Sequence, residues 1–375
     1  MNLENWSLVD VADAIRARRL TSREVVETCL ARIGAWQPRI NAFASVLADS
    51  ACAAADRADA AVAAGVPLGP LHGVPLAHKD MFFRASRRSS LGSHNAPPTS
   101  GAGESSLLGR LDAAGAIEIG TLNMCEFALG PTGHNAWLGD CRNPWHTDHI
   151  ACGSSSGGGA AIAARLAFGA FGSDTGGSVR LPASACGVLG LKPTNGRVTL
   201  AGMMPLSPSV DVPGIFARSA RDVARLLGIV AGRDARDPRS SGLPVPDYEA
   251  SVEHGIAGLR IGVPQNFFLE GIAGDVALRL EESLQALATL GAEIVPVTVP
   301  APEHLTELSR VLVYSEAAAI HGPWLREHAE HYSPQVRVRA ATGLAIPAAA
   351  YQQAQQLRPG ILRRFVEAVF SRCDA

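Results

Sequence analysis

The chain has 375 residues, of which 47% are hydrophobic and 18% are charged, against roughly 25% charged residues in ordinary soluble domains. Lysine and arginine number 33 against 35 acidic residues, so the charge balance gives no electrostatic reason to expect direct binding of nucleic acid. The seven cysteines are an odd number without paired spacing, which favours reduced thiols in a cytosol-like compartment.

The sequence shows neither a signal peptide nor a membrane span. The opening residues 1–5 contain no basic region followed by an apolar run. The longest apolar stretch, 160–171, is shorter than the roughly 20 residues that a spanning helix needs, and Arg165 interrupts it. We therefore expect a soluble, cytoplasmic protein that does not bind a membrane.

The first 80 residues predict three helices and one strand. An apolar face after Ser7 predicts the first helix, and Thr21-Ser22-Arg23-Glu24 is a capping box that predicts the start of the second. An alanine-rich segment predicts a third helix over 49–64. The apolar run 73–80 predicts a strand that ends in the charged pair Lys79-Asp80.

The middle of the chain alternates helices and strands around one long loop. We expect helices over 105–114 and 156–165, and strands over 117–119 and 167–172. The segment 130–156, rich in glycine, asparagine and proline, is too long for an ordinary connection in a compact domain. We therefore expect this loop to contribute to function.

Alternation continues to the end of the chain. The patterns predict helices over 220–230, 276–290 and 361–370, and strands over 259–263 and 293–299. Such alternation is typical of an α/β fold with a central sheet and helices on both faces. No linker or compositional break separates two parts, so we expect one domain over 1–375.

Two glycine- and serine-rich loops flank one predicted helix and one predicted strand. They are Cys152-Gly153-Ser154-Ser155-Ser156-Gly157-Gly158-Gly159 and Gly172-Ser173-Asp174-Thr175-Gly176-Gly177-Ser178-Val179-Arg180. Together they would collect hydroxyls and free amides, which suits a nucleophile with an oxyanion hole. A phosphate cradle or plain turns remain alternatives, although the Lys of a Walker loop is missing.

The run from Leu71 to Ala231 resembles the amidase-signature hydrolases. The resemblance is carried in order by Gly73–Asp80, Asn123–Ala128, Arg142–Trp145, the loop around Ser155, Gly172–Pro182 and Gly187–Thr194. It implies a three-layer α/β fold, with a large mixed central sheet and helices on both faces, and it implies no cofactor. Family members usually continue beyond the segment 370–375, so the C-terminus looks truncated relative to the family.

The resemblance also assigns a catalytic triad. Ser178 would be the acylated nucleophile, Lys79 the base, and Ser155 the bridging serine that family members hold on a cis peptide. A serine hydroxyl is a weak nucleophile until a base takes its proton. Lysine can do so only when neutral, and its ordinary pKa is about 10.4, so Lys79 must lie in a closed pocket that lowers this value. The alternative is that Lys79 forms an ion pair with Asp80 at the surface and has no catalytic role.

Other residues of the two loops receive supporting roles. The resemblance places the oxyanion hole at the backbone amides of Thr175, Gly176, Gly177 and Ser178. Ser154 and Ser156 are expected to be loop and helix-cap residues. Asp174 and Arg180 are expected to brace the nucleophile loop through charge-assisted hydrogen bonds, and the alternative for Arg180 is contact with substrate.

No metal is expected at the site. Cys141, His146 and His149 have loosely metal-like spacing, as do His72 and His78, but neither set matches a known zinc pattern. Cys152 and Cys186 lie near the two loops, but a cysteine nucleophile needs a paired histidine.

The sequence therefore predicts a cofactor-free amidase that hydrolyses a small-molecule carboxamide. The loop 133–145 looks more like stand-alone amidases than like the first alternative, the glutaminase component of a tRNA-dependent transamidation complex. The second alternative is a homologue impaired by its missing C-terminus. A homodimer is left open.

Overall fold

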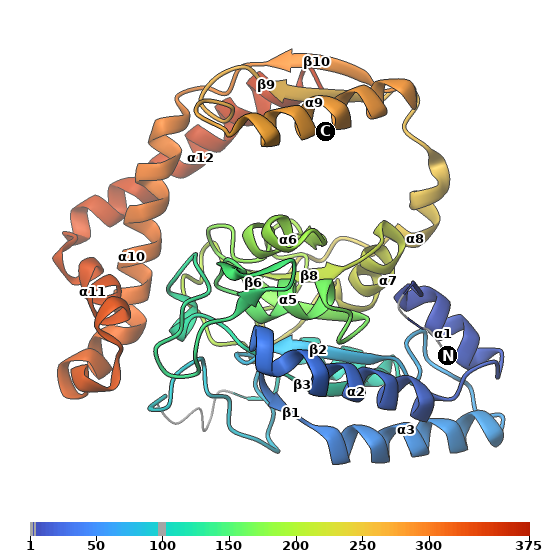
Figure 1. The fold of residues 1–375 in the computed structure, drawn as a ribbon. Coiled ribbons are helices and arrows are strands. Elements are labelled where there is room, and N and C mark those ends of the chain that lie inside the picture. The colour runs from blue at the N-terminus through green and yellow to red at the C-terminus, as the bar shows by residue number, and fades with distance from the viewer. Residues whose placement is uncertain (1–2, 4, 97–102) are drawn as a thin grey trace. The chain divides into compact units, whose positions relative to one another are not determined.

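The computed structural model describes residue 3, residues 5–96 and residues 103–375 (Figure 1). Residues 1, 2 and 4, on which part of the signal-peptide expectation rests, lie outside the described residues. The chain forms two compact units. The first comprises Met1–Glu249 and Glu316–Ala341, and the second comprises Ala250–Ser315 and Thr342–Ala375.

The first unit is built on a six-stranded mixed sheet. Its strand order is β1-β3-β2-β6-β8-β7. β2 is parallel to both β3 and β6, whereas β1 is antiparallel to β3, and β8 is antiparallel to β6 and β7. The strands are β1 (Phe43–Val46), β2 (Pro75–Lys79), β3 (Ile117–Leu122), β6 (Gly169–Asp174), β7 (Leu189–Leu191) and β8 (Val212–Ala217).

Helices cover both faces of this sheet. Every residue of the central strands β2, β6 and β8 is buried, as expected for strands that are covered on both sides. The expected α/β fold with a mixed central sheet is therefore confirmed. The helices of the first 249 residues are α1 (Leu8–Arg16), α2 (Ser22–Ile40), α3 (Ala48–Ala63), α4 (Ser106–Ala113), α5 (Ser156–Ala163), α6 (Arg180–Cys186), α7 (Ala220–Val230) and the start of α8 (Tyr248–Ser251).

The starts of α1 and α2 agree with the capping residues in the sequence. Thr21 accepts from the amide of Glu24, and the Glu24 carboxylate accepts from the amide of Thr21, so the predicted capping box at α2 is confirmed. Ser7 makes the same reciprocal pair with Asp10 at α1. These caps satisfy amides that have no partner within the first turn of the helix.

The long segment 130–156 is less irregular than expected. It contains the short antiparallel hairpin β4 (Arg142–Asn143) and β5 (His146–Ile150). Asn143 and Trp145 connect this hairpin to the end of α6, because Asn143 Nδ2 donates to the carbonyl of Ala185 and Trp145 Nε1 donates to that of Cys186.

The second unit has a separate, parallel strand pair. β9 (Arg260–Pro264) pairs with β10 (Glu293–Val297), and α9 (Gly274–Thr289) connects them. A small apolar cluster joins Val297 and Val299 to Val369 and Cys373 from the end of α12 (Ala348–Phe370) and beyond. Across the described residues, no helix is long and apolar enough to cross a membrane.

Two helices connect the units in sequence. α10 (Pro302–Glu327) begins in the second unit and ends in the first, where a short turn leads into α11 (Pro334–Thr342). The sequence analysis did not predict α10 or α11. α10 has almost no one-sided apolar pattern, and Pro323 lies inside it, so the usual signals of an amphipathic helix are missing.

Candidate functional site

Lys79 is the last residue of the central strand β2, and its amine is enclosed by protein. The side chain is 2% exposed. Its Nζ lies 2.7 Å from Ser154 Oγ and 2.9 Å from Ser173 Oγ, and it donates a hydrogen bond to each hydroxyl. The alternative of a surface pair with Asp80 is therefore wrong. Asp80 instead accepts hydrogen bonds from the amide and the hydroxyl of Ser90.

Burial changes the proton affinity of this amine. It lowers the pKa of Lys79 to about 7, from 10.5 for a free side chain. The nearby Cys125, Asp211 and Asp174 act in the opposite direction, but the loss of hydration outweighs them. A large share of Lys79 is therefore neutral at physiological pH, as a lysine base requires.

The hydroxyl next to Lys79 belongs to Ser154. The peptide bond between Gly153 and Ser154 is cis. The prediction that Ser155 follows the cis peptide and contacts Lys79 is wrong, because Ser154 occupies both positions. A repeat of three identical residues, Ser154 to Ser156, does not reveal from the sequence which hydroxyl points to the lysine.

Ser155 instead joins α5 to β6. Its hydroxyl donates to the carbonyl of Ser173 at 3.1 Å and accepts from the amide of Ser173 at 3.3 Å. Its own amide donates to the carbonyl of Ser178 at 3.2 Å. Ser155 stands at the N-cap position of α5 but makes no side-chain cap there. Its contacts therefore hold the two glycine-rich loops together.

The glycines that follow allow this close approach. A Cβ on Gly157 would lie 2.2 Å from the carbonyl oxygen of Ala42, and a Cβ on Gly172 would lie 2.6 Å from Ser155 Oγ. The Ala42 oxygen belongs to the backbone, and the Ser155 hydroxyl is fixed by its two bonds to Ser173, so any larger residue would displace the loop.

The loop that carries Ser178 is organised by one buried carboxylate. Asp174, the last residue of β6, is fully buried and accepts from the backbone amides of Gly177, Val179 and Arg180. The guanidinium of Arg180 donates to both oxygens of Asp174, at 3.0 and 2.8 Å. The expected hydrogen bonds between Asp174 and Arg180 are thus present, while the Arg180 side chain remains half exposed.

These bonds reduce the set of free amides in the loop. The amide of Gly177 donates to Asp174 Oδ1 at 2.8 Å, so it is not available to a substrate oxygen as the sequence analysis expected. In the part of the chain that the structure describes, the amides of Thr175, Gly176 and Ser178 donate to no protein acceptor. The hydroxyl of Ser178, which is half buried, likewise has no hydrogen-bond partner among the described residues.

Ser173 and Asp211 are contacts that the sequence analysis missed. Ser173 supplies the second hydroxyl on Lys79. Asp211 precedes β8, is 2% exposed and accepts from the Thr175 hydroxyl at 2.5 Å. Ser173 lies inside the glycine-rich motif, next to Asp174 at the end of β6, and this position in the motif was the available signal for a role at the site. Asp211 lies 36 residues beyond Thr175, with no local pattern to indicate it.

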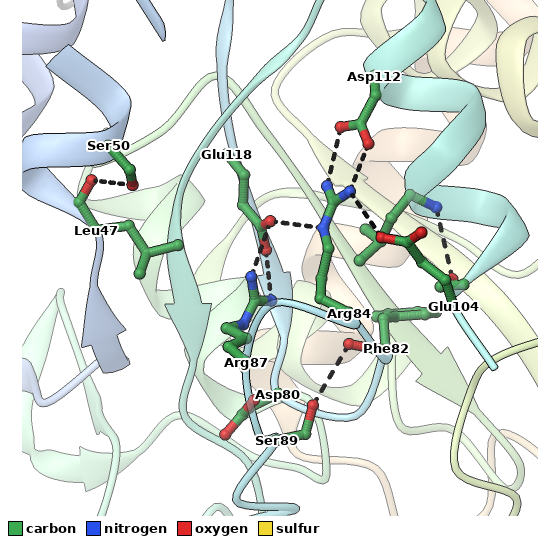
Figure 2. Close-up of polar contacts among 12 residues, drawn as sticks. Leu47, Ser50, Asp80, Phe82, Arg84, Arg87, Ser89, Glu104, Asp112 and Glu118 are labelled. Carbon is green, nitrogen blue, oxygen red and sulfur yellow. Dashed lines mark hydrogen bonds and ion pairs between the residues drawn. The ribbon is translucent and has the colours of Figure 1, made fainter. Parts of the chain in front are cut away.

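The segment after Lys79 is held by an ion-pair network (Figure 2). Arg84 lies between Asp112 of α4 and Glu118 of β3, and Arg87 also pairs with Glu118, at 2.6 Å. Arg84 and Glu118 are largely buried, with side chains 12% and 11% exposed. Pairs of this kind order a loop more effectively than exposed ones, so the network fixes the chain that leaves the base.

The long loop that the sequence analysis expected to be functional supports Ser154. The amide of Gly153 donates to the carbonyl of Pro131 at 2.7 Å, and the amide of Cys125 donates to that of Ser154 at 3.0 Å. Glu126, next in the chain, is buried and accepts from Trp137 Nε1 and from Ser333. The loop therefore contributes a backbone hydrogen bond at Gly153 and a side-chain hydrogen bond from Trp137.

The other candidate residues from the sequence have ordinary contacts. His146 and His149 pack against each other, with ring centroids 4.6 Å apart. Cys141 is buried, His72 Nε2 contacts the carbonyl of Ala58, and His78 packs against Phe171. The Cys186 thiol donates to the carbonyl of Ala151.

Ser154→Ala and Ser155→Ala should separate the two neighbouring serines. We expect Ser154→Ala to lower kcat by roughly 10²–10⁴, the range of a positioned acid-base group. Ser155→Ala removes bonds to the Ser173 backbone, and should instead lower stability by about 1 kcal/mol with a smaller loss of kcat. The check is steady-state amide hydrolysis beside thermal unfolding of both variants. A larger loss of kcat in Ser155→Ala than in Ser154→Ala would instead identify Ser155 as the proton relay.

Known proteins resemble the chain in sequence and in fold. A relative from Halorhodospira halophila, the A component of a glutamyl-tRNA(Gln) amidotransferase, is 40% identical over 96% of this chain and 78% of its own length. The native peptide amidase of Stenotrophomonas maltophilia superposes with a TM-score of 0.86 at 30% identity, over 98% of this chain and 82% of its own. A third similar structure is a chain from an inhibitor-bound vestigial protein complex, related to the origins of an s-triazine catabolic enzyme. It superposes with a TM-score of 0.92 at 36% identity, over 98% of this chain and 80% of its own. The amidase family model matches residues 24–375, and the chain belongs to the amidase family.

Proposed function

We propose that the protein hydrolyses the C–N bond of a small-molecule carboxamide through an acyl-enzyme on Ser178, with Lys79 as base and Ser154 as proton relay. The observation that carries the proposal is the buried Lys79 amine, 2.7 Å from Ser154 Oγ and with its pKa lowered to about 7. Family membership supports the reaction class.

In the first half of the reaction, a proton moves from Ser178 to Lys79 through Ser154. Neutral Lys79 accepts the proton of Ser154. The Ser178 hydroxyl, which has no hydrogen-bond partner in the described chain, turns toward Ser154 and gives it its proton as Ser178 Oγ attacks the substrate carbonyl carbon. The carbonyl oxygen becomes an oxyanion, for which the free amides of Thr175, Gly176 and Ser178 are the available donors. When the C–N bond breaks, the proton returns along the same path to the leaving nitrogen, and ammonia or an amine departs.

In the second half, water replaces the leaving nitrogen. Lys79, neutral again, accepts a proton from water through Ser154 while the water oxygen attacks the ester carbon. Collapse of the second oxyanion breaks the bond to Ser178 Oγ, and the hydroxyl regains its proton. Each turnover consumes one water, releases a carboxylic acid and one amine or ammonia, and needs no cofactor.

A second candidate is the A component of a tRNA-dependent amidotransferase. It is favoured because the relatives with 35–40% identity carry that description. Under this proposal glutamine would be the amide donor, and turnover would depend on partner subunits. The stand-alone amidase remains the first proposal, since solved structures with TM-scores of 0.86 and above include a peptide amidase.

Ammonia release from a panel of amides tests the two proposals. The full chain should be assayed alone with aliphatic, aromatic and amino-acid amides, with glutamine in the same panel. Turnover of non-glutamine amides by the chain alone supports the amidase, whereas turnover of glutamine only, and only with added subunits, supports the amidotransferase. Inactivity with every substrate, together with a failure of Ser178 to react with a fluorophosphonate, would favour an impaired homologue. We further propose that the protein is cytoplasmic and makes no direct contact with nucleic acid. Its oligomeric state is a separate question, and sedimentation of the same sample distinguishes a monomer from a homodimer.

A further inference from the structure

Three side chains of metal-binding type meet in the turn between α10 and α11. His328, Glu330 and His331 each place one ligand atom within 4.8 Å of the other two. Oε1 of Glu330 lies 3.9 Å from Nδ1 of His328 and 3.5 Å from Nε2 of His331. Over residues 5–96 and 103–375, no other group of histidine, cysteine and acidic side chains has this spacing.

The turn is held in this shape by contacts of its own. The imidazole rings of His328 and His331 are parallel to within 5° and 5.0 Å apart. Trp324 packs against both rings, at 6.0 and 5.7 Å, and against the buried Tyr332 at 5.1 Å. The amide of His328 donates to the carbonyl of Trp324, and that of His331 to the carbonyl of His328. These contacts hold the two imidazoles in place, while the Glu330 side chain is 69% exposed.

The distances fit a small divalent transition metal. Zinc binds imidazole nitrogen and carboxylate oxygen at about 2.0–2.2 Å in tetrahedral geometry, which places neighbouring ligand atoms about 3.4 Å apart. The separations of 3.5 and 3.9 Å are close to this value. Because the two imidazoles are stacked and their lone pairs lie in the ring planes, one ring must rotate for both nitrogens to point at one ion.

We propose that His328, Glu330 and His331 bind one zinc-class divalent ion, with the fourth position taken by water. Two imidazoles and one carboxylate favour zinc, nickel or copper over magnesium, which prefers oxygen ligands alone. The ion joins the end of α10 to the segment before α11. None of the three residues contacts Lys79 or Ser154 among the described residues, so we expect the ion to stabilise the fold and to take no part in amide hydrolysis.

Isothermal titration of the chelator-treated full chain with zinc sulfate tests this site. We expect one equivalent to bind the wild-type protein and to raise its Tm, while magnesium chloride does neither. Glu330→Gln keeps the size of the side chain and should weaken zinc binding at least tenfold. His328→Ala combined with His331→Ala should abolish it. Removal of zinc should leave the rate of amide hydrolysis unchanged.

The matched control is His146→Ala combined with His149→Ala. These two exposed histidines also lie in contact, at 4.6 Å, but belong to no three-ligand group among the described residues. This variant should keep the wild-type affinity and the zinc-dependent rise in Tm. Wild-type affinity in both Glu330→Gln and the His328/His331 variant would overturn the proposal, as would the absence of stoichiometric zinc binding in the wild-type protein.

Discussion

Ser178→Ala is expected to abolish amide hydrolysis, with a loss of kcat on the order of 10⁶, the size seen when a serine hydrolase loses its nucleophile. Ser154 and Ser173, the two hydroxyls that contact Lys79, are 0% and 2% exposed, so a substrate carbonyl does not reach them as it reaches Ser178. The measurement is ammonia or amine release by the purified variant with the best substrate of the wild-type protein.

The fold should survive this substitution. The Ser178 side chain makes no hydrogen bond within the described chain, so its loss removes no internal contact of that kind. The Tm of Ser178→Ala should therefore stay close to that of the wild-type protein. Residual activity within tenfold of the wild-type rate, in a folded variant, would mean that the nucleophile is another group.

Lys79→Met is expected to lower kcat by roughly 10⁴ or more, the upper end for a positioned base, because methionine fills the space without accepting a proton. In the wild-type protein, kcat/KM should rise about tenfold per pH unit up to a pKa of about 7 and then level off, since only the neutral amine is a base. A pH profile between 5 and 9 on both proteins is the measurement. A flat wild-type profile would contradict the role of Lys79.

Lys79→Met lowers activity but should raise the stability of the fold, by an amount that depends on pH. The pKa of Lys79 is about 7 when folded and 10.5 for the free side chain, so the unfolded state binds more protons between these values. Stability of the wild-type protein therefore falls as the pH drops from 10.5 to 7 and gains no further penalty from this group below 7. Methionine carries no charge, so Lys79→Met lacks this cost. The Tm of Lys79→Met relative to the wild-type protein should therefore increase as the pH falls from 10.5 to 7. A difference in Tm that is independent of pH would contradict the assigned pKa.

The elements that could be predicted from the sequence are those with local signals. The capping residues Thr21 and Glu24 indicated the start of α2, and the apolar run before Lys79 indicated β2. α10 could not be predicted in this way, because its apolar residues do not gather on one face. Helices of this kind depend on contacts with distant parts of the chain, and a single sequence does not report those contacts.

The site was predictable by residue type more than by exact position. Lys79, Asp174 and Arg180 make the kinds of contact expected for them. Ser154 and Ser155 were exchanged, because each is a serine before a glycine run and only the path of the backbone decides which hydroxyl meets the lysine. The amide of Gly177 was assigned to substrate, although Asp174 binds it. Hydrogen bonds that form only after the loop has folded leave no pattern in the sequence.

Localisation of the covalent adduct tests the central claim most directly. The wild-type protein should be treated with a fluorophosphonate probe at about pH 8, where Lys79 is mostly neutral, then digested and analysed by tandem mass spectrometry. We expect a single major adduct on Ser178, formed much more slowly in Lys79→Met and in Ser154→Ala. An adduct on another residue, or labelling that persists at the wild-type rate in Ser178→Ala, would contradict the claim.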